Sequence, residues 1–267
     1  MLGKLIKHEF KHTSKLIFPL WILLAVITVL GRIVAQSIIA SGSEDISNGM
    51  AIFHVITIFI YIFGVIVISF TSYIYLIVRF QRSLFGAEGY LMHTLPVTPW
   101  QLLLSKTIVS FIWMIAETLL TLLSIFCIFA SGTVFDQVSD FLNSYGGLSG
   151  LTQFVFGMTP AHAMMFMILF ILISTLSGIL VPYLCICIGQ LWQQHKTAGT
   201  FLAFVVILII SQIIGAFHSS STINPSAADD MTFVVTTYHW SMIQTGVMSV
   251  LSFIGSGLLM KKKVNLD

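Results

Sequence analysis

Two charged side chains interrupt long apolar runs of this sequence. Arg32 lies in the run 17–40, and Glu117 lies near the middle of the run 107–130. If these runs cross a membrane, a charge at mid-bilayer costs on the order of 2.5–3.5 kcal/mol on insertion scales. Charged residues that occur within the membrane despite this cost usually form an ion pair, bind an ion or line a polar pathway. These two residues are therefore the first candidates for chemistry within the chain.

Arg32 and Glu117 could form an ion pair inside a helix bundle. Counted from the inner ends of the two runs at about 1.5 Å per residue, Arg32 lies roughly 22 Å deep and Glu117 roughly 15 Å. Because an arginine side chain covers much of that difference, we expect the pair to form, either as a structural link or as part of a polar pathway. In the alternative, Glu117 is protonated and hydrogen-bonded alone, and Arg32 reaches outward to the interface.

Other kinds of chemistry have no matching residue pattern. His54, His162 and His239 lie near the ends of the apolar runs, and none of them is four residues from another potential metal ligand. The cysteines, Cys127, Cys185 and Cys187, lie in apolar runs, and an odd number of thiols gives no disulfide framework. The sequence contains neither a GxxxxGKS nor a GxxxxGKT phosphate-binding loop, and no serine nucleophile has a base at matching depth. We therefore expect no enzyme activity, metal or cofactor in this chain.

Six apolar runs have to position these residues. Hydrophobic residues make up 57% of the chain and charged residues 8%, with a mean hydropathy of +0.99, whereas a soluble domain carries about a quarter charged residues. A membrane-crossing helix needs about 20 apolar residues. We expect an all-α polytopic membrane protein whose single transmembrane domain covers 1–267. The six expected spans are approximately 17–40, 51–78, 107–130, 161–189, 199–217 and 239–260.

The basic residues indicate how the spans are oriented. All lysines and arginines except Arg32 fall at 4–15, 79–106, 196 and 261–263, and the alternate connections carry acidic residues instead. Since cytoplasmic loops carry the excess of Lys and Arg, the N- and C-termini should both be cytoplasmic in a multi-pass protein of the cell membrane. The net charge of +2 reflects no separate basic domain, so we expect no nucleic-acid partner.

Residues 2–15 predict an amphipathic helix ahead of the first span. Its lysines recur every three or four residues and share one face, with apolar side chains opposite. Such a helix lies in the cytoplasmic interface with its lysines toward anionic lipid head groups. The alternative is a solvated start that only enforces orientation. The residues assigned to this interfacial helix are Lys4, Lys7, Glu9, Phe10, Lys11 and Lys15.

The longest cytoplasmic connection, 79–106, holds a helix start and a second, shorter helix. Thr98 is a capping hydroxyl, Pro99 suits the first helical position, and Gln101 follows three residues after the cap, so a helix begins there and runs into the third span. Pro96 ends the shorter helix upstream, whose exposed apolar side chains suggest a partner surface. In the alternative, this helix folds back onto the spans. Its exposed residues are Tyr90, Leu91, Met92 and Leu95.

Two connections on the opposite side are longer than turns. In 131–160, apolar residues at helical spacing predict a short surface helix, followed by a flexible break at Gly146, Gly147 and Gly150. The segment 218–238 is rich in serine and threonine and predicts no particular element.

Two cytoplasmic motifs are more specific than the layout. One is His8-Glu9-Phe10-Lys11 near the start of the chain, and the other is EGYLMHTLPV, from Glu88 to Val97. With the layout of spans, they resemble bacterial ABC transporter permeases of the type-two exporter class, as found in Gram-positive bacteria. The resemblance implies a coupling helix, between spans 2 and 3, that docks on an ATPase. The implied coupling residues are Glu88, Gly89, Tyr90, Leu91, His93, Thr94, Leu95 and Pro96.

The resemblance implies the transmembrane permease subunit of an ATP-driven exporter. Two permease chains, identical or related, would pair with two separate ATPase subunits, which bind the ATP and Mg. The apolar spans, solvated by membrane lipids, suit a hydrophobic or amphipathic substrate such as a peptide, an antimicrobial or a lipid-like molecule. The alternative is an ion-coupled secondary transporter that uses Glu117, although such a protein favours an internal repeat and several mid-membrane carboxylates.

Overall fold

Helices make up nearly all of the described structure. The computed structural model describes residues 2–41, 48–86, 98–130, 132–192, 195–222 and 230–262. Its helices are α1 (Leu2–Ser41), α2 (Asn48–Phe85), α4 (Pro99–Phe129), α5 (Gly132–Ser144), α6 (Gly147–Phe156), α7 (Pro160–Gly189), α8 (Lys196–Thr222) and α9 (Asp230–Lys262). All except α5 and α6 are long and apolar enough to cross a membrane, which confirms the expected all-α fold with six spans over the described ranges.

Several of the spans extend further than their apolar runs, among them α1, α2 and α4. α1 is one continuous helix, so the predicted helix over 2–15 is present and merges with the first span. α2 continues to Phe85, which places Arg79 inside a helix instead of a connecting loop. α4 begins at Pro99 and includes Lys106, as the predicted helix start implies. Arg79 and Lys106 both contact Glu9 of α1.

The start of α4 follows its predicted signature. The Thr98 hydroxyl accepts a hydrogen bond from the Gln101 backbone N–H at 3.4 Å, and the Gln101 side-chain oxygen accepts one from the Thr98 backbone N–H at 3.2 Å. Pro99 occupies the first helical position, where a backbone N–H has no partner within the helix. The predicted helix start is confirmed, and it fixes where the connection between α2 and α4 ends.

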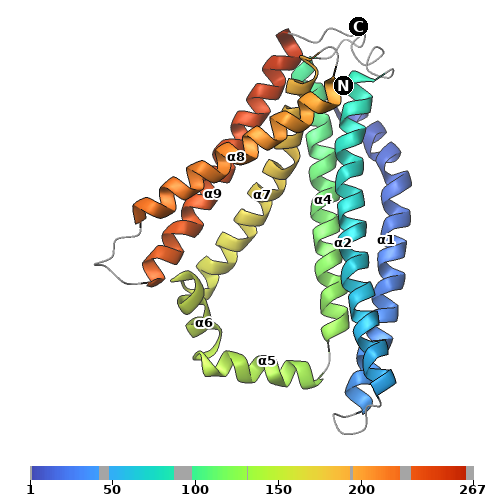
Figure 1. The fold of residues 1–267 in the computed structure, drawn as a ribbon, viewed down its shortest axis with the longest axis vertical. Helices are drawn as coiled ribbons and strands as arrows, with labels where there is room; N and C mark the ends of the chain where they lie inside the picture. The colour runs from blue at the N-terminus through green and yellow to red at the C-terminus, as the bar shows by residue number, and fades with distance from the viewer. Residues whose placement is uncertain are drawn as a thin grey trace.

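The spans form two groups of three that meet at one end (Figure 1). α1, α2 and α4 lie side by side in one group, and α7, α8 and α9 form the other. The groups diverge toward the far end, where α5 and α6 connect α4 with α7. The start of α1 and the end of α9 both lie where the groups meet.

An apolar core fastens the two groups together at that end. Its side chains come from α2, α4, α7 and α9, and Leu5 of α1 packs against it. The rings of Phe80 on α2 and Tyr183 on α7 stack with centroids 3.6 Å apart. Its buried members are Phe80, Leu84, Leu102, Leu103, Ile179, Tyr183, Ile186, Cys187 and Met260. Elsewhere along the spans many large apolar side chains are exposed, as expected of helices that lipid surrounds.

The connection 131–160 contains the predicted surface helix and one more. Gly146 and Gly147, with φ of 78° and 80°, separate α5 from α6 in a backbone conformation that favours glycine. The expected break is therefore present at these two residues, whereas Gly150 lies inside α6.

Candidate functional site

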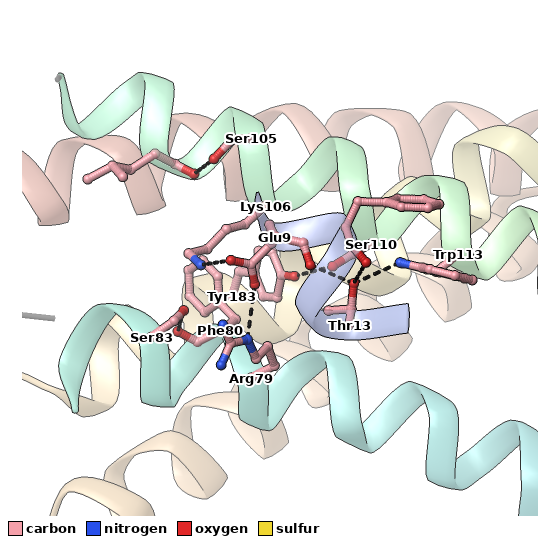
Figure 2. A network of polar contacts seen from close by, with 12 residues as sticks. Glu9, Thr13, Arg79, Phe80, Ser83, Ser105, Lys106, Ser110, Trp113 and Tyr183 are labelled. Atoms are coloured by element: carbon pink, nitrogen blue, oxygen red, sulfur yellow. Dashed lines mark hydrogen bonds and ion pairs between the residues drawn. The ribbon is translucent and has the colours of Figure 1, made fainter. Parts of the chain in front are cut away.

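A buried carboxylate lies between two basic side chains where three helices meet (Figure 2). Glu9 of α1 contacts Arg79 of α2, with Oε1 3.2 Å from Nε, and Lys106 of α4, with Oε2 3.0 Å from Nζ. Only 6% of Glu9 and 3% of Lys106 is exposed. Charge-assisted hydrogen bonds of this kind are about twice as strong as neutral ones. We call Glu9, Arg79 and Lys106 the ion triad.

Aromatic and hydroxyl side chains surround the ion triad. The Ser110 and Tyr183 hydroxyls share a hydrogen bond of 2.7 Å, and the Trp113 indole N–H donates to Thr13 Oγ1 at 2.9 Å. Tyr183 also stacks on Phe80, and both rings lie beside the triad in Figure 2. Because Tyr183 belongs to α7, these contacts bring the second group of helices up to the triad.

α1 and α4 lie parallel in a fixed register along a line of polar contacts. The Trp21 indole N–H donates to Glu117 Oε2 at 2.5 Å. The hydroxyls of Thr28 and Ser124 share a hydrogen bond of 2.6 Å. In both pairs the residues are 96 positions apart, and Arg32 donates to a backbone carbonyl of α4 at the same separation. We call this line of contacts between α1 and α4 the polar seam.

The expected ion pair between Arg32 and Glu117 is wrong. The Arg32 guanidinium donates to the carbonyls of Ile128 at 2.9 Å and Ala130 at 2.7 Å. These oxygens lie at the C-terminal end of α4, where carbonyls lack intrahelical partners and the helix dipole favours a cation. Glu117 is level with Trp21, so about 16 Å of helix, at about 1.5 Å per residue, separates it from Arg32.

The error arose from where the helices were assumed to begin. If the two helices start level at residues 17 and 107, each α1 residue lies beside the α4 residue 90 positions later in the sequence. The observed hydrogen bonds instead join residues that are 96 positions apart. The extra six residues shift α4 by about 9 Å along α1. The helices instead start almost level, because α1 begins at Leu2 and α4 at Pro99.

Glu117 makes its hydrogen bond in the seam without a basic partner among the described residues. It is 5% exposed. Its Oε1 atom has no hydrogen-bond partner in the described structure, and the same holds for the buried hydroxyl oxygens of Ser72 on α2 and Thr121 on α4. Of the sequence hypotheses, a Glu117 that is hydrogen-bonded apart from Arg32 is the one that this geometry fits.

The residues assigned to the interfacial helix divide between two environments. The four lysines are exposed, as expected of a face that meets water or head groups. Glu9, in contrast, is buried in the ion triad, and Phe10 stacks on Trp113 with centroids 4.6 Å apart. The face opposite the lysines therefore packs on α4 instead of entering lipid alone.

The predicted coupling residues, from Glu88 to Pro96, lie outside the described residues. The helices on either side of them are described, and both contribute a basic residue to the ion triad: Arg79 from α2 and Lys106 from α4.

Sequence reasoning assigns Arg79 to a connecting loop and gives Lys106, in the helix that runs into the third span, no partner, so it misses the ion triad. A usable signal was present in α4, where polar or indole side chains recur every three or four residues and so share one helix face. This stripe consists of Lys106, Ser110, Trp113, Glu117, Thr121 and Ser124. A stripe of that composition in a membrane-crossing helix predicts a polar partner helix.

A tyrosine links the two groups of helices where proline interrupts α7. Pro182 has no N–H, so the carbonyl four residues earlier, on Gly178, loses its usual intrahelical donor. The Tyr73 hydroxyl of α2 donates to that carbonyl at 2.8 Å. The bond satisfies a partly buried backbone acceptor and holds α2 against α7.

The sequence matches no model of a protein family, and neither curated proteins nor solved structures match it. Among the described residues, no three His, Cys, Asp or Glu side chains are placed to hold a metal ion.

Proposed function

We propose that this chain is the transmembrane permease subunit of an ATP-driven exporter of the ABC class, acting with a separate ATPase subunit and a second permease chain in the cell membrane. The ion-triad end faces the cytoplasm in this proposal, since the basic residues gather there. The observation that carries it is the ion triad itself, because Glu9 joins the N-terminal helix to both helices that flank the proposed coupling segment.

The ion triad gives that segment a mechanical route into the spans. When ATP binding closes the ATPases, a push on the connection between α2 and α4 moves Arg79 and Lys106 together with their helices. Both pull on the same carboxylate, so α1 follows. The stacked rings of Phe80 and Tyr183 pass the movement to α7. The two groups of helices, joined at this end and apart at the other, then change their separation to release the substrate outward.

Co-purification from the native host tests the proposal. The wild-type chain should bring down a nucleotide-binding subunit that hydrolyses ATP, and Leu91→Glu in the coupling segment should abolish this. Phe141→Glu on α5 is the matched control, because Phe141 is exposed at the opposite end and should leave the complex intact. If no ATPase accompanies the wild type, or if Leu91→Glu retains it, the permease function fails.

A transport assay on the same purified chain distinguishes the proposed permease from an ion-coupled secondary transporter. Such a transporter would accumulate its substrate in vesicles that contain the purified chain alone, driven by an imposed ion gradient and abolished by Glu117→Gln. The permease should show no such uptake without its ATPase.

A further inference from the structure

A polar cavity of about 410 Å³ lies between α7, α8 and α9, apart from the polar seam. This volume is on the order of a dozen waters at about 30 Å³ each and is within the usual size of ligand sites. Half of the lining side chains carry a hydroxyl or a carboxamide, although all lie in candidate membrane spans. These polar residues are Tyr73, Ser174, Ser177, Ser211, Gln212, Ser241, Gln244 and Thr245.

The polar lining distinguishes this cavity from a neighbouring hollow beside α9, which has a volume of about 530 Å³ and is lined almost entirely by apolar side chains, such as Ile243 and Val247. Part of the polar lining is satisfied without a ligand, because Ser174, Ser241 and Thr245 donate to backbone carbonyls of their own helices. Further hydrogen-bonding atoms that face a space within the membrane are costly unless they find partners. Among the described residues that line the polar cavity, none is Asp, Glu, Lys, Arg or His, which argues against an ionic ligand.

Two fixed groups give the cavity a defined hydrogen-bonding pattern. The Gln244 side-chain N–H₂ group donates to the Ser211 carbonyl at 2.7 Å and to the Ser211 hydroxyl at 3.1 Å. The carboxamide is therefore held in one orientation, with its oxygen as the remaining acceptor. Tyr73 of α2, which also lines the cavity, is fixed by its bond to Gly178. A preorganised acceptor of this kind suits a ligand that carries hydroxyl or amide donors.

The remaining wall of the cavity is apolar and includes Phe204, Leu208 and Met248. We propose that the cavity binds the uncharged, hydrogen-bonding head of an amphipathic molecule, with the apolar part of that molecule against these three side chains. That this molecule is the transported substrate rests on the proposed permease function, whereas the binding site itself does not.

Photo-cross-linking to the full chain in lipid nanodiscs tests the site with two matched probes. One probe is a monoacylglycerol with a diazirine in its acyl chain, and the other is the fatty acid with the same chain and diazirine. The monoacylglycerol should label the cavity-lining side chains Phe204 and Met248, as mapped to the residue by mass spectrometry. The fatty acid, which is anionic at neutral pH, should label exposed apolar side chains such as Ile209 and Ile243 but not Phe204 and Met248.

Three variants make the result specific. Gln244→Leu removes the fixed acceptor, and Gly178→Leu fills the cavity, because a Cβ at Gly178 would meet no atom within 4 Å. Gln244→Leu should reduce monoacylglycerol labelling of the cavity at least about fivefold, the change expected from one lost hydrogen bond. Gly178→Leu should reduce the labelling by at least as much, because its side chain occupies the cavity. Gly246→Leu is the control, since Gly246 lines the neighbouring apolar hollow instead. It should leave the labelling unchanged.

Two results would overturn the proposal. The first is equal labelling of the cavity by the fatty acid, which would mean that head-group chemistry does not matter. The second is labelling that survives both Gln244→Leu and Gly178→Leu. Size-exclusion profiles and thermal unfolding identify a misfolded variant. If Gln244→Leu is misfolded, the result for Gly178→Leu decides the test. No ATPase is needed, so failure here is distinct from failure of the co-purification test.

Discussion

Glu9 and Lys106 are 97 residues apart in the sequence, yet their charged groups lie 3.0 Å apart in the interior of the bundle. Because Arg79 contacts the second oxygen of the same carboxylate, one acidic side chain holds two helices that are separate from its own. The arrangement concentrates three charges where α1, α2 and α4 come together. Its energetic consequence can be measured directly.

Replacing the shared carboxylate should be severe. Glu9→Gln removes the carboxylate that Arg79 and Lys106 share, and breaking a buried ion pair on one side typically costs about 3–5 kcal/mol. We expect a large loss of thermal stability in detergent. Lys11→Gln on the exposed face of α1 is the control and should change stability by less than about 0.5 kcal/mol. Comparable losses from both variants would contradict the role of the triad.

The register of the polar seam should be visible by cross-linking. Thr28 and Ser124 have hydroxyl oxygens 2.6 Å apart, so cysteines at these positions should form a disulfide under mild oxidation. The experiment needs a Cys127→Ser background, because Cys127 is exposed on the same helix. Cysteines at Thr28 and Glu117 lie on different levels and should not cross-link. The opposite pattern of bands would show a different register.

Reversing both charges within the membrane should give no rescue. Arg32→Glu with Glu117→Arg should express no better than the worse of the two single variants, because about 16 Å of helix lies between these positions. Arg32→Met alone should destabilise the protein by about 1–3 kcal/mol, since two carbonyls at the end of α4 lose their donor. Recovery of expression in the double reversal would restore the idea of a direct pair.

The link between Tyr73 and Pro182 should appear as a coupling energy. Tyr73→Phe leaves the Gly178 carbonyl without a donor and should cost about 1–3 kcal/mol in thermal unfolding. In a Pro182→Ala background the new backbone N–H can satisfy that carbonyl, so the cost of Tyr73→Phe should fall to less than half. Additive effects of the two substitutions would mean that the tyrosine and the proline act independently.

The elements that the sequence predicted well are those with local causes. Apolar length identified all six spans, and the Thr98, Pro99 and Gln101 pattern located the start of α4 to the residue. Helical spacing found the surface helix after the third span. Each of these depends on neighbours within one or two turns, which the sequence shows directly.

The polar contacts between helices could not be predicted from neighbouring residues in the sequence. Basic residues mark the ends of spans statistically, so Arg79 was assigned to a loop, and the acidic residue that pairs with both Arg79 and Lys106 lies far away in the chain. The relative height of two helices depends on where each begins. The helix starts assumed from the apolar runs were wrong by several residues, and this shift was enough to predict a pair between Arg32 and Glu117.

The polar seam also bears on how the chain enters the membrane. α1 is synthesised first, but its partners on α4 follow 96 or 97 residues later, roughly 5–20 s at typical elongation rates. During that interval Glu9 lacks Lys106, and Arg32 lacks the α4 carbonyls that accept its hydrogen bonds. α1 must then be sheltered by lipid head groups or by the insertion machinery until the third span arrives. A chain that stops after α2 should accordingly be held by that machinery or degraded, and pulse-labelled truncations would reveal which.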